Sequence, residues 1–359
     1  MNINLIIQKR KAFFIVIAFF MVITGWFLNG SKASAADEKR LLREKYEIVD
    51  LPHSRVIQAF DIYKNGSDIY LFVIQQNVNT PKLTLYRLVN GDFVKQSTIS
   101  IDQGGHGDSL AVEGNHIWIT GTKANVNDGT PVPVVKRLTF TLAESSGKKI
   151  INITSTKVIK NLVYNVISNS VTYNNLKRAF VAVTGTRLCI KISFQGTGMP
   201  AGDYYRVYSL ADLNDALNSL SGSELSLNTA SVGTSAKLAT FHYSVNVNQG
   251  IDIDGGYIYG SKGGGHQLPR LLKLKYTTKT KGSAQAATIQ TIGNGLSYEY
   301  DIVLYRSSSD TGNRIEAEGV QRVPIAFGPF GAGTYVMPGV YDLSDNRKAA
   351  LYFVTSNKP

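Results

Sequence analysis

The chain has 359 residues, of which 43% are hydrophobic and 18% charged, and it contains one cysteine. This length and composition exclude a disordered chain and a small domain held together by disulfides. Val, Ile, Thr, Tyr and Gly are abundant, which is typical of strands joined by turns. The formal net charge of +12 favours attraction to anionic polymers.

The first 35 residues have the pattern of a secretory signal peptide. A basic stretch over residues 9–11 precedes an apolar run over residues 13–28, and the small-x-small sequence Ala33-Ser34-Ala35 follows. This pattern predicts a secreted, extracellular protein that is cleaved after Ala35 or Ala36. The alternative is an uncleaved membrane anchor. Cleavage removes four cations and no anion, which leaves the mature chain with a charge of +8.

The rest of the chain predicts one β-rich domain. Residues 36–47 are charged, so residues 36–54 are expected to form a solvated N-terminal leader and residues 55–359 a single domain. Alternating strand patterns cover residues 68–74, 82–88, 115–120, 178–183, 256–260 and 349–354. Turn-forming pairs separate the strands, among them Asn65-Gly66, Asn90-Gly91, Asp128-Gly129 and Asp254-Gly255. The only predicted helix is Leu210–Leu220, where four leucines share one face.

A weak repeat aligns five units, each with a polar start, a strand, a turn and a second strand that carries an aromatic residue. The starts are spaced 48, 62, 81 and 69 residues apart and are Gln58, His106, Ser168, Gln249 and Glu318. This repeat predicts an all-β fold, a five-bladed β-propeller with loops of variable length, and the alternative is a β-sandwich. The innermost strands of a propeller converge on its axis, so the polar starts are expected at the mouth of a central funnel.

The candidate ligand-binding residues are therefore Gln58, His106, Asp108, Gln249 and Glu318. Three glycines surround His106 within Gln103–Leu110, which allows a ligand to approach the imidazole closely. The alternative is that His106 bonds to the backbone of neighbouring blades.

Acidic residues near the inner-strand starts raise the possibility of hydrolysis. Asp61, Asp108, Glu113 and Glu318 lie on or near these starts, and paired carboxylates near a propeller axis can cleave glycosidic bonds. Asp108 and Glu318 are the candidate catalytic pair of this alternative. A polar funnel that holds only water has the same composition.

The sequence contains no motif for metal binding, nucleophilic catalysis or phosphate binding. The five histidines are scattered, and no nucleophile elbow or phosphate loop is present. No metal or cofactor is therefore expected. Nucleic-acid recognition motifs are missing as well. Cys189 lies in an alternating strand pattern, where it is expected to be a half-buried, small hydrophobic residue.

Three sequence blocks resemble the helveticin J family of secreted class III bacteriocins. The blocks are Gln103–Glu113, Asn248–Tyr259 and Ile315–Gln321. They are also similar to the teichoic acid biosynthesis protein C family and to the receptor-binding propeller of certain staphylococcal phages. The resemblance implies a five-bladed propeller, and its phage member implies recognition of wall teichoic acid.

The expected function is that of a secreted, helveticin-like bacteriocin that binds an anionic cell-wall glycopolymer of related bacteria through its funnel. Net positive charge would supply long-range attraction, and the polar funnel residues would select the sugar or phosphate unit. A wall-glycan or teichoic acid hydrolase is the first alternative. A wall-binding or wall-assembly protein without killing activity is the second.

Overall fold

The computed structural model divides the chain into two parts, Met1–Glu38 and Lys39–Pro359. All described residues except Glu38 belong to the second part, and the predicted signal peptide lies outside them. None of the helices in the described residues is long and apolar enough to cross a membrane. The described residues are 38–48, 51, 57–76, 80–105, 107–124, 131–162, 176–194, 202–227, 236–243, 249–262, 270–276, 296–305, 315–317, 319–323, 335–341 and 349–354.

Three sheets are built almost wholly from antiparallel strands that follow one another along the chain. The first sheet contains β2 (Ile57–Asn65), β3 (Asp68–Gln75), β4 (Lys82–Val89) and β5 (Asp92–Ser100). The second sheet contains β6 (Leu110–Glu113), β7 (His116–Ala124), β8 (Pro131–Ser145), β9 (Lys148–Lys160) and, parallel to β9, β13 (Glu224–Ser226). The third sheet contains β10 (Leu176–Thr184), β11 (Arg187–Phe194), β12 (Gly202–Ser209) and β14 (Lys237–Tyr243).

The remaining strands form one sheet of nine strands. Its order is β15 (Gly250–Asp254), β16 (Tyr257–Lys262), β17 (Arg270–Tyr276), β18 (Leu296–Tyr305), β1 (Glu38–Glu47), β22 (Ala349–Val354), β21 (Tyr335–Tyr341) and β19 (Ile315–Ala317). The last strand, β20 (Gln321–Arg322), also pairs with β21. The sheet therefore combines two antiparallel runs, which meet where β18 pairs with β1.

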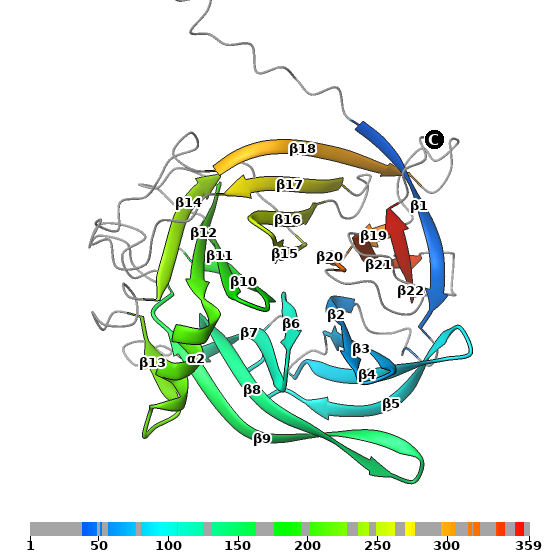
Figure 1. Ribbon diagram of the computed structural model, residues 1–359, viewed down its shortest axis with the longest axis horizontal. Helices are drawn as coiled ribbons and strands as arrows, with labels where there is room; N and C mark the ends of the chain where they lie inside the picture. The colour runs from blue at the N-terminus through cyan, green and yellow to red at the C-terminus, as the bar shows by residue number, and fades with distance from the viewer. Residues whose placement is uncertain are drawn as a thin grey trace, which may run out of the picture. The chain divides into compact units, whose positions relative to one another are not determined.

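The sheets surround a common axis, with β2, β6, β10, β15 and β20 nearest the centre (Figure 1). Each of the three smaller sheets runs outward from its innermost strand, as the order β2-β3-β4-β5 illustrates. This arrangement is a β-propeller. The all-β prediction is confirmed, and the predicted strand patterns fall within β3, β4, β7, β10, β16 and β22, apart from single residues at their ends.

The hairpin turns follow from local sequence. Asn90 and Gly91 link β4 to β5 with φ of 52° and 99°. Two consecutive positive φ values match the right-handed twist of the strands that the turn joins. Glycine and asparagine tolerate this region best, which explains why Asn-Gly pairs marked the hairpins correctly.

The prediction of a solvated leader is wrong for residues 38–47. These residues form β1, which pairs with β22 from Leu42↔Val354 to Glu47↔Ala350. Tyr46 is 7% exposed, and its ring meets Phe93 edge-on with centroids 5.8 Å apart. The sequence of residues 38–47 is mostly charged and contains few apolar residues, so the alternation that marks a strand is sparse there.

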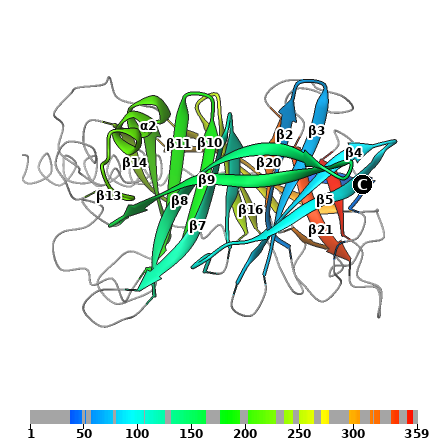
Figure 2. The same cartoon turned by 90° about the horizontal axis from the view of Figure 1, so that it is seen from below.

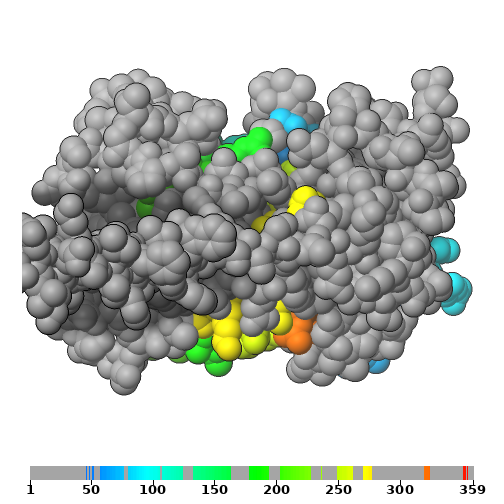
Figure 3. All heavy atoms as spheres, turned by 90° about the horizontal axis from the view of Figure 1, so that it is seen from above, coloured from blue at the N-terminus to red at the C-terminus, as the bar shows by residue number. Residues whose placement is uncertain are grey.

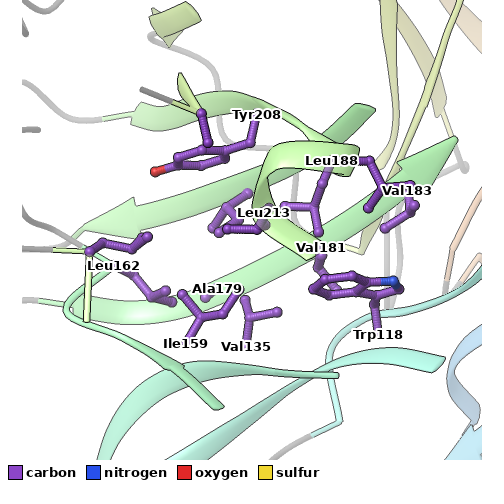
Figure 4. Packing of buried hydrophobic residues seen from close by; sticks show 14 of the residues in the cluster. Trp118, Val135, Ile159, Leu162, Ala179, Val181, Val183, Leu188, Tyr208 and Leu213 are labelled. Atoms are coloured by element: carbon purple, nitrogen blue, oxygen red, sulfur yellow. The ribbon is translucent and has the colours of Figure 1, made fainter. Parts of the chain in front are cut away.

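The largest hydrophobic cluster among the described residues lies between the second and third sheets (Figure 4). Trp118 and Val135 from the second sheet pack with Val181 and Leu188 from the third. Helix α2 (Leu210–Asn218) closes this cluster with its leucines, after an N-cap at Ser209. It ends at Asn218, with Ser219 as its C-cap, rather than at the predicted Leu220.

Arg137 attaches α2 to the second sheet. Its guanidinium is 2% exposed and donates to the side chains of Asn214 and Asn218 at 2.6 and 2.7 Å. The long hairpin of β8 and β9 also reaches the first sheet, where it crosses the outer strand β5 (Figure 2). There the amide of Lys149 donates to the Gln96 side chain at 3.1 Å.

Candidate functional site

A cavity of about 370 Å³ lies on the propeller axis. The innermost strands of all the sheets contribute to its wall, because each of them ends beside the axis. The lining is rich in charged and polar side chains: Asp61, Tyr63, Lys64, Glu113, Thr184, Asp252, Gln321 and Arg322. We call this space the axial cavity.

Polar side chains on the innermost strands bond to the backbone of the next innermost strand. Asp61 on β2 accepts from the amide of Val112 on β6, and Asp252 on β15 accepts from that of Arg322 on β20 at 2.6 Å. These carboxylates therefore have a structural role beside any chemical one, since they satisfy backbone groups that face the axis.

Two further contacts of this kind join the start of β6 to β10 and β20 to β2. We call such a contact between two innermost strands a joint. The Ser109 hydroxyl donates to the carbonyl of Val181 at 2.7 Å and accepts from its amide. The Gln321 amide group accepts from the nitrogen of Ile62 at 2.8 Å and donates to its oxygen at 3.2 Å. The last of these bonds links the end of the chain back to the first sheet.

The joint residues occupy one position of the sequence repeat. Each lies three residues after a predicted start, as Asp61 follows Gln58 and Asp252 follows Gln249. The same offset leads from His106 to Ser109 and from Glu318 to Gln321. The starts drew attention in the sequence, but in these four units it is the fourth position that carries the polar contact. A comparison of all positions in the repeat would have found it.

The third repeat unit is out of register in the sequence alignment. Its start at Ser168 lies outside the described residues, and it places Phe180 on a second strand. In the structure Phe180 lies on β10, the innermost strand of its sheet. Alignment of Arg178-Ala179-Phe180 with Gln58-Ala59-Phe60 restores the register and puts Val181 at the joint position.

Three carboxyl groups converge on the axial cavity, and burial raises the pKa of each. Burial raises the pKa of Asp252 to about 7, against the opposing effect of its two backbone hydrogen bonds. The pKa of Asp61 lies well above its ordinary value, mainly through burial, with nearby Asp252 and Glu113 adding to the shift. Burial also raises the pKa of Glu113.

Glu113 differs from the other two carboxyl groups in its contacts. Among the described residues no hydrogen bond joins its carboxylate to another side chain or backbone group. It lies at the end of β6, next to Gly114, where the strand turns at the cavity. A half-exposed carboxylate with free lone pairs can accept hydroxyl protons from a ligand.

Arg322 lies beside these carboxyl groups, but its side chain is paired with a different carboxylate. Its guanidinium forms an ion pair with Asp254 and lies 5.6 Å from the ring centroid of Tyr259. Figure 3 shows the segments concerned side by side at the surface, in yellow for residues 249–262 and 270–276 and in orange for residues 319–323. The positive charge of Arg322 is thus paired with the Asp254 carboxylate of β15. Lys64, which also lines the cavity, is exposed to solvent.

The opposite stretch of the axis, at the starts of the innermost strands, is narrow. The space there is only about 10 Å³, enough for roughly one water molecule. A Cβ atom placed on Gly250 would lie 2.7 Å from the Cα of Gly319. The two backbones can approach this closely because neither residue has a side chain.

Of the predicted ligand-binding residues, three are described. Gln58 is buried, with 7% of its surface exposed. Asp108 lines the narrow space and lies 3.8 Å from Arg178. Gln249 donates its backbone amide to Ser261 at 3.2 Å. His106 and Glu318 lie outside the described residues.

The structure therefore brings together a different set of groups from the predicted starts. Asp61 and Glu113, considered in the sequence for their carboxylates, line the axial cavity. Asp252 and Arg322 had not been predicted as site residues. Cys189, expected to be half-buried, is fully buried in β11, and burial raises the pKa of its thiol.

The fold and this site define a β-propeller with an acidic cavity on its axis. No family model matches the chain, and no curated protein matches it. Among solved structures, it is similar to an exo-β-1,3-galactanase from Phanerochaete chrysosporium at 10% identity and a TM-score of 0.44. That match covers 88% of this chain, which spans 64% of the galactanase chain.

Two further similar structures are carbohydrate-acting enzymes by name. The catalytic domain of a Coprinopsis cinerea α-L-arabinofuranosidase gives 11% identity and a TM-score of 0.39, with 89% of this chain and 98% of that chain covered. A xylan β-1,4-xylosidase from Bacillus halodurans is similar at 10% identity and a TM-score of 0.42. That match covers 84% of this chain and 54% of the xylosidase chain. Structural similarities this weak do not indicate the activity of this chain.

Proposed function

We propose that the protein is a five-bladed β-propeller that binds a glycan in its axial cavity and hydrolyses it. The blade count treats the nine-stranded sheet as two blades. These are β15–β18 and the set of β19, β20, β21, β22 and β1. With the three smaller sheets this makes five blades, each with one innermost strand at the cavity.

The observation that carries the hydrolytic proposal is the convergence of Asp61, Glu113 and Asp252 from three blades on one cavity. Hydrolysis of a glycosidic bond needs one carboxyl group that is protonated and one that is ionised. A pKa raised to about 7 keeps Asp252 protonated in mildly acidic solution. Glu113 has its lone pairs free to act on water.

The proposed step uses these two groups in opposite roles. Asp252 donates its proton to the glycosidic oxygen while the bond from that oxygen to the anomeric carbon breaks. Glu113 takes a proton from a water molecule, whose oxygen bonds to the same carbon. Asp252 ends as a carboxylate and Glu113 as an acid, so the protons balance, and exchange with solvent restores both. Asp61, tied to Val112, holds the two strands in place.

The test is release of reducing ends from isolated Gram-positive cell walls and from a panel of plant and microbial polysaccharides. Glu113→Gln and Asp252→Asn should each lower the rate by about 100-fold or more, since each removes a group that transfers a proton. Glu144→Gln, on the exposed β8–β9 hairpin, is the matched control and should retain full activity. No release from any polymer, or an active Glu113→Gln protein, would refute the hydrolase proposal.

A second candidate function is capture of an anionic wall glycopolymer without hydrolysis, as in a helveticin-like bacteriocin. The blocks that carry the family resemblance supply β6, β15, β19 and β20, all from the region around the axis. The mature charge of +8 supports long-range attraction to such a polymer. Retention on isolated walls should then weaken between low and high salt, with growth of indicator cells inhibited. Salt-independent retention would contradict this candidate.

Secretion is part of both candidate functions. The basic stretch, apolar run and Ala33-Ser34-Ala35 support export and cleavage by a signal peptidase. The intact mass of the secreted protein tests this, because a mass that retains residues 13–28 would refute cleavage.

A further inference from the structure

A second cavity adjoins the axial cavity. It measures about 630 Å³ and lies between the β10–β11 turn and the β15–β16 turn. Thr184 lines both cavities, and Asp254 follows directly on the axial residues Asp252 and Ile253. A ligand longer than one sugar unit can therefore occupy both spaces. We call this second space the side groove.

Arg187 gives the side groove a positive charge. Its guanidinium donates to the Tyr276 hydroxyl at 2.8 Å and lies 5.5 Å from the centroid of that ring. Among the described residues no carboxylate forms an ion pair with it. A guanidinium has five N–H donors, so the ring contact fixes the group in place while most of its donors stay available.

Asp254 does not cancel this charge. Its carboxylate is paired with Arg322, so these two charges cancel and the charge of Arg187 remains. Glu113 is a further carboxylate beside the groove, with Oε1 4.0 Å from the Cβ position of Gly185. Thr184 and Thr186 add hydroxyl donors to the lining, and Gly185, Gly255 and Gly256 leave it open, with no side chains beyond Cα.

We propose that the side groove binds an anionic substituent, a phosphate or a carboxylate, on the glycan held in the axial cavity. The inference rests on the proposed glycan-binding function and narrows its substrate to an acidic glycan. Arg187 acts as the binding residue, since the planar guanidinium bonds both oxygens of such a group at once. Tyr276 acts as a positioning residue.

The test measures binding rather than hydrolysis. Glucose 6-phosphate, glucuronate, glucose and inorganic phosphate are titrated into the protein, with affinities followed by ligand-observed NMR. The wild type should bind at least one of the charged sugars about tenfold or more tightly than glucose. Preference for the phosphate over the carboxylate, or the reverse, identifies the substituent.

Three variants separate the binding role of Arg187 from a structural one. Arg187→Gln should bring the affinity for the charged sugar to within about twofold of the affinity for glucose, because the charged guanidinium group is lost. Lys148→Gln removes the same charge from the exposed hairpin and should change nothing. Tyr276→Phe removes the hydroxyl that accepts from Arg187 but leaves the guanidinium. This variant should keep most of the preference for the charged sugar.

The outcomes distinguish this proposal from the hydrolase proposal. Binding does not depend on hydrolysis, so the wild type should prefer the charged sugars even if no polymer is ever hydrolysed. Equal affinity of the wild type for charged and neutral sugars would overturn the anionic-substituent proposal. An Arg187→Gln protein that keeps the preference would overturn it too, as would a Tyr276→Phe protein that loses it completely.

Discussion

A lysine with no exposed surface lies inside the third sheet. Lys191 on β11 and Asp203 on β12 are both 0% exposed, with Nζ and Oδ2 3.6 Å apart. The ammonium also lies 3.6 Å from the ring centroid of Phe180, and Ser193 donates to the other oxygen of Asp203 at 2.5 Å. Burial lowers the pKa of Lys191, and Asp203 opposes that shift. The two charges are stable here because each compensates the other.

Lys191→Met keeps the volume of the side chain but leaves Asp203 buried without its cation. We expect a loss of about 3–5 kcal/mol in the free energy of unfolding, measured by urea denaturation. Adding Asp203→Asn should recover much of the loss, since no unpaired charge then remains. Lys149→Met, at the exposed pair with Glu144, should stay close to the wild type. If the Lys191→Met protein is as stable as the wild type, the pair of Lys191 and Asp203 contributes nothing to the free energy of unfolding.

The carboxyl groups of the axial cavity make stability depend on pH. In the folded protein the pKa of Asp252 is about 7 and that of Asp61 is also raised, whereas in the unfolded chain both lie near 4. The folded state thus holds protons that the unfolded chain has released. The contribution of Asp252 to the free energy of unfolding is fully present below about pH 4 and falls as pH rises to about 7, by up to about 1.4 kcal/mol per pH unit. Asp61 changes the stability in the same direction.

Asp252→Asn removes one of these groups. The free energy of unfolding should then fall less steeply with pH, by the contribution of about one proton. Urea titrations at half-unit pH steps measure the slope for both proteins. Equal slopes would mean that Asp252 titrates alike in the folded and unfolded states.

At the scale of elements, β1 closes the nine-stranded sheet. It pairs with β22 and with β18, and Tyr46 and Ile48 at its end belong to the core beside the first sheet. Without β1, two strand edges and part of this core would be exposed to solvent, a condition that favours aggregation.

A chain that begins at Val49 should therefore be less stable than one that begins at Ala36. The two buried side chains alone account for about 3–6 kcal/mol, measurable as a lower midpoint of thermal unfolding. A peptide of residues 37–48 added to the shortened chain should restore part of the loss. If both chains unfold at the same temperature, β1 does not contribute to the fold.

At the scale of the whole molecule, Gln321 joins the last innermost strand to the first. Its amide group pairs with both backbone groups of Ile62, 259 residues away along the chain. Ser109 makes an equivalent joint to Val181, but there the connecting chain also links the two sheets.

Gln321→Leu removes the partner of the Ile62 carbonyl and one of the two partners of the Ile62 amide, which keeps its bond to the Asp61 carboxylate. We expect a loss of about 1–3 kcal/mol for the unpaired carbonyl, with faster hydrogen exchange at Ile62. Ser109→Ala breaks the comparable joint and should give a loss of similar size at Val181. Unchanged exchange at Ile62 in the Gln321 variant would contradict a role in ring closure.

Local sequence determined the strands, the turns and the presence of the helix. Alternation of apolar residues marks a strand with one buried face, and Asn90-Gly91 marks its turn, because both are properties of neighbouring residues. The spaced repeat also indicated that the innermost strands meet at one axis. Asp61 and Glu113 could be considered on that basis before the structure was known.

Only the tertiary structure decided which groups share a cavity. Asp252, Arg187 and Arg322 gain their roles from strands that are distant in sequence, and the burial that raises the pKa of Asp252 exists only once the blades pack. The pairing of β1 with β22 is equally non-local, since the charged sequence of residues 38–47 carries no local sign of a partner. Periodicity reports on adjacent residues, whereas ring closure depends on contacts between the two ends of the chain.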